Sequence, residues 1–155
     1  MTVTQESLRL ATIAALAADE KKADNIIVLD VSDVLAISDA FVIASADTER
    51  QVRAIVEEVE EKLTEAGIEP IRREGNRENR WVLLDYGIVV VHVQRQAERE
   101  FYGLDRLYRD CPVIAIEGLP EASRPGEFGD EVDVRNVSSI DEIPLAEQEP
   151  EVEEE

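Results

Sequence analysis

The most constraining feature of the sequence is a regular pattern of apolar residues between residues 48 and 67. Apolar side chains recur there at intervals of three and four residues: Val52, Ile55, Val56, Val59, Leu63 and Ala66. This spacing places them on one face of an α-helix. Thr48 and Gln51 have the spacing of a capping box at its start, and Gly67 stands where a helix stop is expected. The pattern predicts an amphipathic helix that packs against a larger core.

Other patterns predict the sheet that this helix covers. Residues 25–31 and 40–46 are short runs that are apolar on both faces, as expected of central strands covered on both sides. Pro70 favours an edge position for a third strand at residues 68–74. Thr2 and Gln5 have capping-box spacing for a first helix. The other predicted elements are helices at residues 2–20 and 96–110 and strands at residues 80–86, 88–93 and, as a short addition, 113–116. The fold class is therefore α/β, a single domain with a mixed sheet and the order α-β-β-α-β-β-β-α.

Residues 80–93 predict an antiparallel hairpin. If its loop is Tyr86 and Gly87, Trp81 lies opposite His92, and both share a face with Asp85. The opposite face is purely aliphatic and is predicted to be core: Val82, Leu84, Val89 and Val91.

Charge divides the 155-residue chain into two parts. The formal net charge is −20, and residues 117–155 carry 14 acidic and 2 basic residues, against 22 and 14 in residues 1–116. The acidic part also holds four of the six prolines and too little apolar material to offset the entropy of ordering. We therefore expect a folded domain at residues 1–116 and an acidic, largely disordered tail at residues 117–155.

Composition also limits the function. No apolar run approaches the ~18 residues that span a bilayer, and the first residues do not resemble a signal peptide, so we expect a cytoplasmic protein without membrane contact. One cysteine, Cys111, and one histidine, His92, give neither a disulfide framework nor a zinc site, and we expect no metal and no cofactor. The acidity argues against broad binding to nucleic-acid backbones, although a local basic patch could still lie near RNA.

Arginines and aromatic residues gather between residues 72 and 109. This segment holds 8 of the 16 basic residues and five of the seven aromatic residues. Aromatic residues mixed with arginine are typical of interface hot spots. The alternative is one edge of the core surrounded by solvated arginines. Trp81 and His92 fit either reading, because both residue types also occur packed and hydrogen-bonded inside domains.

Several separated motifs together resemble the Iojap-related ribosomal silencing factors. They are residues 81–93 (WVLLDYGIVVVHV), 99–108 (REFYGLDRLY), and 39–46 (DAFVIASA) followed by 50–52 (RQV). The resemblance covers roughly residues 5–111 and leaves the tail outside. It implies a protein that binds the large ribosomal subunit through its fourteenth protein, sterically prevents joining of the small subunit, and so lowers translation when nutrients are scarce. It also implies no catalysis and a homodimer when the protein is free, while the local basic patch leaves room for a peripheral contact with rRNA.

The same resemblance implies which residues line or support the docking surface. Trp81, Asp85 and His92 match the strand motif of the family. The helix motif adds five further residues: Arg99, Tyr102, Leu104, Asp105 and Tyr108.

An enzyme is the main alternative function, because the fold of the family resembles that of nucleotidyltransferases. Such enzymes hold phosphate with a Gly-Ser turn and magnesium with an acidic pair two residues apart, since hard cations need convergent oxygen ligands. Here the first position reads Ala44-Ser45-Ala46, and Asp30 and Asp33 are three residues apart. The sequence thus predicts a nucleotidyltransferase-like fold without the catalytic set. An acidic adaptor with another protein partner is the second alternative.

Overall fold

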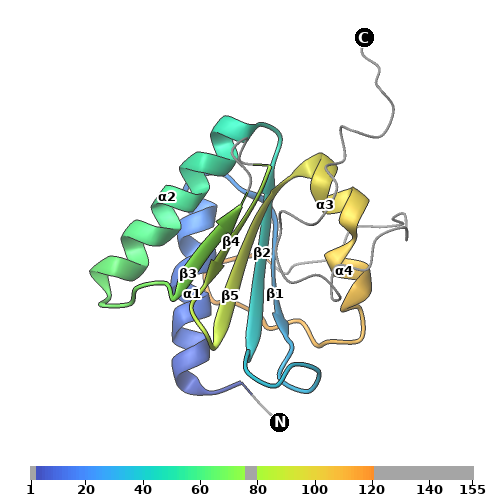
Figure 1. Ribbon diagram of the computed structural model, residues 1–155. Coiled ribbons are helices and arrows are strands. Elements are labelled where there is room, and N and C mark those ends of the chain that lie inside the picture. Colours follow the sequence, from blue (N-terminus) through green and yellow to red (C-terminus); the bar gives the residue numbers. More distant parts are fainter. Residues whose placement is uncertain (1–2, 76–79, 121–155) are drawn as a thin grey trace.

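The computed structural model describes residues 3–75 and 80–120, which form one α/β domain (Figure 1). In chain order its elements are α1 (Gln5–Glu20), β1 (Asp24–Asp30), β2 (Ala40–Ala46), α2 (Glu49–Glu65), β3 (Arg72–Gly75), β4 (Trp81–Asp85), β5 (Val89–Arg95), α3 (Gln96–Tyr102) and α4 (Leu104–Leu107). The predicted order is confirmed up to α3, beyond which the last predicted helix is divided in two.

The described strands form one mixed sheet in the order β1-β2-β5-β4-β3. Strands β2 and β5 run parallel, and the other neighbouring pairs are antiparallel. Helices α1 and α2 cover one face of the sheet, and α3 and α4 lie on the other (Figure 1). The predicted fold class, a single α/β domain with a mixed sheet, is confirmed.

The two faces of the sheet differ in composition. The face under α1 and α2 is aliphatic and includes all four residues assigned to the core from the hairpin pattern, namely Val82, Leu84, Val89 and Val91. The cluster between the other face and helices α3 and α4 contains most of the buried aromatic residues, Phe41 and Trp81 from the sheet and Tyr102 and Tyr108 from the covering segment, and we call this face of the sheet the aromatic face. The sequence-predicted site therefore lies on the aromatic face.

Helix α2 begins and ends where its sequence predicts. The hydroxyl of Thr48 accepts a hydrogen bond from the Gln51 N–H at 3.1 Å, and the helix starts at the next residue. Gly67, with a φ of +83°, takes the left-handed conformation that ends a helix. The Thr48 cap and the Gly67 stop are confirmed, whereas the Gln51 side chain, the other half of the predicted capping box, donates instead to the carbonyls of Lys21 and Lys22.

Helix α1 is capped by Thr4, so the prediction that Thr2 forms the cap was wrong. The Thr4 hydroxyl accepts a hydrogen bond from the Ser7 N–H at 3.1 Å. The carboxylate of Asp39 fixes this first turn from outside, because it accepts hydrogen bonds from the Ser7 hydroxyl at 2.7 Å and from the Thr4 N–H at 3.3 Å. These bonds, chiefly that from Ser7, lower the pKa of Asp39. Asp39, 35 positions from Thr4 along the chain, thus helps to fix this cap, which local spacing does not reveal.

Strand β1 lies at an edge of the sheet, although its sequence predicts a central strand. The chain that follows α4 covers its outer side, where the Ile114 N–H donates to the Val28 carbonyl and the Asp30 N–H donates to the Pro112 carbonyl, both at 2.8 Å. The strand predicted at residues 113–116 is reduced to one isolated bridge, between Leu29 and Val113. Strand β1 is apolar on both faces because each face packs against an apolar cluster. At the other edge is β3, as Pro70 predicts, although β3 begins only at Arg72.

The loop of the β4–β5 hairpin consists of Gly87 and Ile88, not of Tyr86 and Gly87. The Tyr86 N–H donates to the Val89 carbonyl at 2.9 Å, which closes the hairpin on either side of this pair. Gly87 takes a φ of +84° at the first loop position, where a two-residue turn can require glycine. The Asp85 carboxylate accepts a hydrogen bond from the Gly87 N–H at 2.8 Å and fixes this choice.

The changed loop shifts the pairing of the strands by two residues. Trp81 lies opposite Gln94, and Leu83 lies opposite His92. The predicted pair of Trp81 with His92 was therefore wrong. A shift of two residues leaves every side chain on its own face, so Trp81, Asp85 and His92 still share the aromatic face.

The helix predicted at residues 96–110 is broken at Gly103. This glycine has a φ of +63°, ends α3 and precedes α4. Neither short helix has a side-chain hydrogen bond at its N-cap. The left-handed residue turns the chain, so that Leu104 and Tyr108 can return to the sheet face.

Residues 117–120 of the predicted tail are described, and they continue the domain. Leu119 is half-buried and packs against the aliphatic core. The prediction of a disordered segment otherwise falls on residues 121–155, outside the described residues. Among the described residues, no helix combines the length and apolarity that crossing a bilayer requires.

Candidate functional site

The eight sequence-predicted site residues lie on the aromatic face of the sheet or in the helices that cover it. Seven of them are buried, with exposed fractions between 0% and 6%: Trp81, His92, Arg99, Tyr102, Leu104, Asp105 and Tyr108. Asp85 alone is half-buried. For Trp81 and Tyr102, the structure thus supports packed core residues over exposed aromatic residues that anchor a partner. Whether any of the eight takes part in partner binding stays a prediction.

Trp81 and His92 form a buried hydrogen bond across the hairpin. The indole Nε1–H of Trp81 donates to Nδ1 of His92 at 3.2 Å. This donor requires an unprotonated Nδ1, so the bond fixes the neutral ring with its proton on Nε2. Burial lowers the pKa of His92 to about 4, against a smaller opposing effect of the Asp85 charge. His92 is therefore neutral at physiological pH and does not act as a charged contact.

Aromatic rings connect this pair to the helices above the sheet. Phe41 on β2 meets His92 and Tyr108 edge to face, with ring centroids 4.8 and 5.2 Å apart. The ring centroids of Trp81 and Tyr102, which lies on α3, are 5.0 Å apart. Contacts of this geometry contribute about 0.5–1.5 kcal/mol each beyond area burial. The aromatic cluster therefore holds both α3 and α4 against the sheet.

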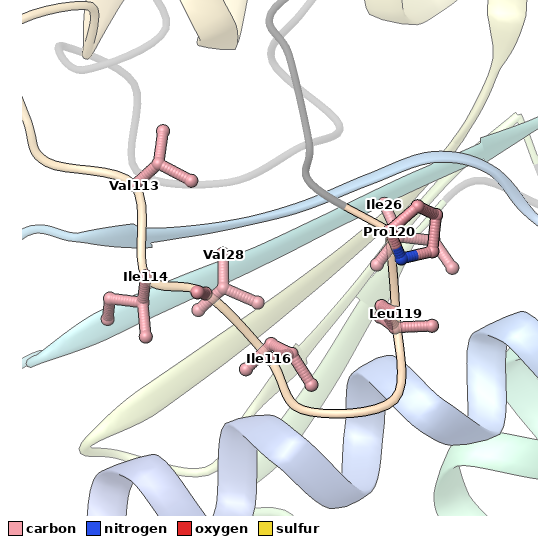
Figure 2. Close-up of a pocket in the computed structure, with 8 residues that line it drawn as sticks. Ile26, Val28, Val113, Ile114, Ile116, Leu119 and Pro120 are labelled. Carbon is pink, nitrogen blue, oxygen red and sulfur yellow. The ribbon is translucent and has the colours of Figure 1, made fainter.

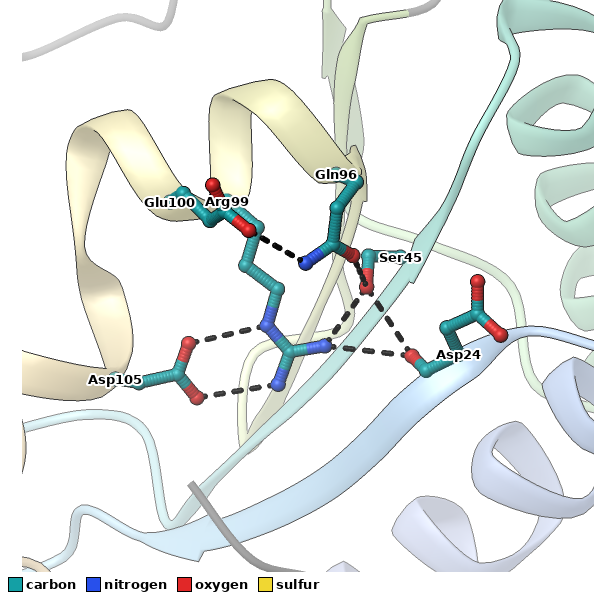
Figure 3. A network of polar contacts seen from close by, with 6 residues as sticks. All are labelled: Asp24, Ser45, Gln96, Arg99, Glu100 and Asp105. Atoms are coloured by element: carbon teal, nitrogen blue, oxygen red, sulfur yellow. Dashed lines mark hydrogen bonds and ion pairs between the residues drawn. The ribbon is translucent and has the colours of Figure 1, made fainter. Parts of the chain in front are cut away.

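Arg99 and Asp105 form a buried ion pair between α3 and α4 (Figure 3). Nε and one terminal nitrogen of Arg99 donate to the two carboxylate oxygens of Asp105 at 3.0 and 3.1 Å. The other terminal nitrogen donates to the Ser45 hydroxyl at 3.0 Å and to the Asp24 carbonyl at 3.4 Å. Arg99 is 0% exposed and Asp105 is 1% exposed. We call these four residues the Arg99 cluster.

Asp85 joins the hairpin to the edge strand. One carboxylate oxygen accepts from the Gly87 N–H, and the other accepts from Nε of Arg72 on β3 at 3.2 Å. Arg72 also pairs with Glu74. Of the eight predicted residues, Asp85 is thus the one whose charge reaches solvent while its position is fixed by its neighbours.

Sequence reasoning missed several polar residues that take part in this site. Ser45 lies in the apolar run of β2, and its hydroxyl bonds to Arg99. Glu98 is fully buried and pairs with Arg95 at 2.9 Å. Gln94 is also fully buried, and neither polar atom of its amide bonds within the described residues. Ser45 and Gln94 are polar residues within largely apolar strands. This pattern is the sequence signal that could have identified them.

An apolar pocket lies on the other side of β1, away from these residues. It has a volume of about 500 Å³ and lies between the strand and residues 113–120 (Figure 2). The lining side chains include Ile26, Val28, Ile116 and Leu119, and none is titratable. None of the eight predicted site residues lines it. The described residues also contain no group of three or more His, Cys, Asp or Glu residues placed to hold a metal ion.

These features define a small α/β protein with a mixed five-stranded sheet and a polar cluster closed to solvent, and comparison with known proteins supplies its relatives. The family model described as "Ribosomal silencing factor during starvation" matches residues 4–141. The chain therefore belongs to the ribosomal silencing factor family, whose function is to repress translation at the ribosome. The match extends past residue 111, where the resemblance read from the sequence ended.

Individual relatives agree with this assignment. A protein named ribosomal silencing factor RsfS from Halalkalibacterium halodurans is 42% identical over 115 residues, which cover 74% of this chain and 96% of the relative. The protein of the same name from Bacillus subtilis is 40% identical over 105 residues, or 68% and 89% of the two chains. A crystal structure of a Chromobacterium violaceum protein matches with a TM-score of 0.64 and 31% identity, covering 90% of this chain and 97% of that chain.

Proposed function

We propose that this protein binds the large ribosomal subunit through its fourteenth protein and sterically prevents the small subunit from joining. The observation that carries the proposal is that the strand motif, residues 81–93, and the helix motif, residues 99–108, both contribute side chains to one apolar cluster on the aromatic face of a family member. The protein would act in the cytoplasm, where ribosomes work, and would form a homodimer when free. Steric exclusion needs a fixed surface and a tight contact, and it needs no catalytic group.

The docking surface that we propose is the outer side of α3 and α4 with the adjoining open part of the sheet. Its apolar residues, Leu83, Phe101 and Leu107, are half-buried and pack on the aromatic cluster from outside. Asp85 and Arg106 add half-buried charges to it. We call these five residues the α3–α4 surface. Apolar side chains held on a rigid base, with charges around them, are typical of protein interfaces.

Charge favours a ribosomal protein over rRNA as the main contact. The chain carries a formal net charge of −20, and a polyanionic backbone repels such a chain. Arg72 and Arg109 are exposed beside the aromatic face, which suits a peripheral rRNA contact only. Electrostatic attraction would instead come from a basic protein surface that meets the acidic domain.

A nucleotidyltransferase activity has less support from the geometry. Residues 44–46, at the place of the phosphate-holding turn, are extended strand and fully buried. The Ser45 hydroxyl already bonds to Arg99 and to the Gln96 side chain, at 3.0 and 3.1 Å. Asp30 accepts hydrogen bonds from the N–H and hydroxyl of Ser32 in its own turn. A differently targeted acidic adaptor is supported by no particular contact and is tested by the same experiment.

Binding to the purified fourteenth protein of the large subunit tests the proposal. Leu107→Asp places a charge in the α3–α4 surface, and we expect it to weaken binding at least tenfold, or by about 1.4 kcal/mol. Leu8→Asp is the matched control, because Leu8 is 42% exposed on α1, at the opposite face of the sheet. Thermal melting of both variants shows whether the domain remains folded. Wild-type affinity in a folded Leu107→Asp variant, or equal loss in both variants, would contradict the proposed surface.

A further inference from the structure

Arg99 joins four separate parts of the chain through one guanidinium group. It belongs to α3 and bonds to Asp105 on α4, to Ser45 on β2 and to the carbonyl of Asp24 on β1 (Figure 3). Both charged partners are closed to solvent. Arg99 therefore offers no nitrogen to a binding partner, and its bonds set the relative positions of the elements it joins.

The backbone alone does not determine the direction of α4. Gly103 separates the two helices in the left-handed conformation, and α3 and α4 span only seven and four residues. Helices of this length are not stable by themselves. The side-on contact between Arg99 and Asp105 spans this bend, and its two parallel bonds fix an orientation as well as a distance.

The position of α4 determines the position of the α3–α4 surface. Arg106 and Leu107 follow Asp105 directly, and both are half-buried at the outer side of the helix. Phe101 lies on α3, two residues from Arg99 in sequence. A rotation of α4 about Gly103 would therefore move Arg106 and Leu107 away from the rest of this surface, which lies on α3 and β4.

We propose that Arg99 and Asp105 are positioning residues for partner binding: they touch no partner and hold α4 in the orientation that makes the α3–α4 surface continuous. This inference rests on the proposed function. It also gives this buried ion pair a physical role other than stability. A buried ion pair alone is poor evidence for stability, because apolar residues of similar volume can often replace it without lowering the free energy of unfolding.

Two variants separate positioning from stability. Arg99→Met lowers the melting temperature, because it leaves Asp105 as a buried charge without its partner. The double variant Arg99→Met/Asp105→Leu removes both charges, so we expect its melting temperature to return close to the wild-type value. If the pair positions α4, the double variant nevertheless binds large ribosomal subunits at least tenfold more weakly. The amide protons of residues 104–108 also exchange faster in it.

Arg99→Lys is a third variant, and it provides the test if the double variant does not fold. Lysine keeps the charge but cannot make the two parallel bonds to Asp105, so we expect weaker subunit binding from a folded protein. Arg53→Met/Glu57→Leu is the matched control, because this exposed i,i+4 pair on α2 has a 3.2 Å contact and is remote from the aromatic face. We expect wild-type binding from it.

Wild-type affinity and unchanged exchange in a folded double variant or a folded Arg99→Lys variant would overturn the positioning role, while leaving the proposed function intact. Absence of binding by the wild-type protein would overturn the proposed function, and the positioning role with it. Reduced affinity with native melting and faster exchange confined to α4 is the result that supports the inference.

Discussion

The buried bond between Trp81 and His92 predicts a specific loss of stability in mild acid. Nδ1 of His92 accepts a hydrogen bond from the Trp81 indole, and burial lowers the pKa of the ring to about 4, from 6.5 in the unfolded chain. Between these two values the unfolded state binds a proton that the folded state does not. The free energy of unfolding must therefore fall as the pH falls from about 6.5 to about 4, and it levels off below that range.

The size of the effect follows from the two pKa values. One pKa unit corresponds to about 1.4 kcal/mol, so the full loss is about 3 kcal/mol, and about 2 kcal/mol of it is reached between pH 7 and pH 5. Urea unfolding at both pH values measures the change, with the fluorescence of Trp81, the one tryptophan, as the signal. A His92→Gln variant is the control, because it keeps every other titratable group and lacks the imidazole.

The comparison of wild type with His92→Gln tests whether the buried imidazole is neutral in the folded state. We expect wild type to lose about 2 kcal/mol more than His92→Gln between pH 7 and pH 5. Equal losses in the two proteins would show that His92 is protonated in the folded state near its ordinary pKa. The assignment of a neutral, buried ring that accepts the indole N–H would then be wrong.

Three further predictions follow from the structure. Tyr102→Ala should lower the free energy of unfolding by about 3–5 kcal/mol in urea titrations, because the ring is 1% exposed; a loss below about 1 kcal/mol would restore the exposed-anchor reading. Thr48→Ala should cost about 1 kcal/mol by the same measurement, since it removes the bond to the Gln51 N–H, whereas Thr48→Ser keeps the hydroxyl and should cost little; equal effects would refute the capping role. A chain ended after Pro120 should melt close to wild type and bind large subunits at least as well at low salt, because the removed part of the strongly acidic segment would be repelled by rRNA; a large drop in melting temperature would show that this part contributes to the fold.

Local patterns were sufficient for the features that depend on neighbouring residues. The spacing of apolar residues gave α2, and alternation along the hairpin gave the aliphatic and aromatic faces of β4 and β5. The faces remained correct after the pairing shifted, because a shift of two residues preserves them. The position of the hairpin loop could not be predicted in this way, because both possible two-residue turns accept a glycine. The hydrogen bond from the Gly87 N–H to the Asp85 carboxylate favours one of them.

Features that depend on distant residues could not be predicted in this way. Ser45, the partner of Arg99 on β2, is 54 positions away, so the motif match indicated only that Arg99 lines or supports a docking surface, and the buried Arg99 cluster was not foreseen. The bend at Gly103 divides a segment that the sequence predicts as one helix, because the contacts that stabilise the bend, such as that of Tyr108 with Phe41, join residues far apart in the chain. Long-range contacts override local helix preference at such positions.

Sedimentation with separated ribosomal subunits tests the central claim most directly. The wild-type protein is mixed with large subunits, with small subunits, or with both under conditions that allow joining, and each mixture is separated on a sucrose gradient. The proposed function predicts that the protein travels with large subunits only and that the peak of joined ribosomes decreases as its concentration rises. Equal travel with both subunits, travel with neither, or an undiminished peak of joined ribosomes would contradict it.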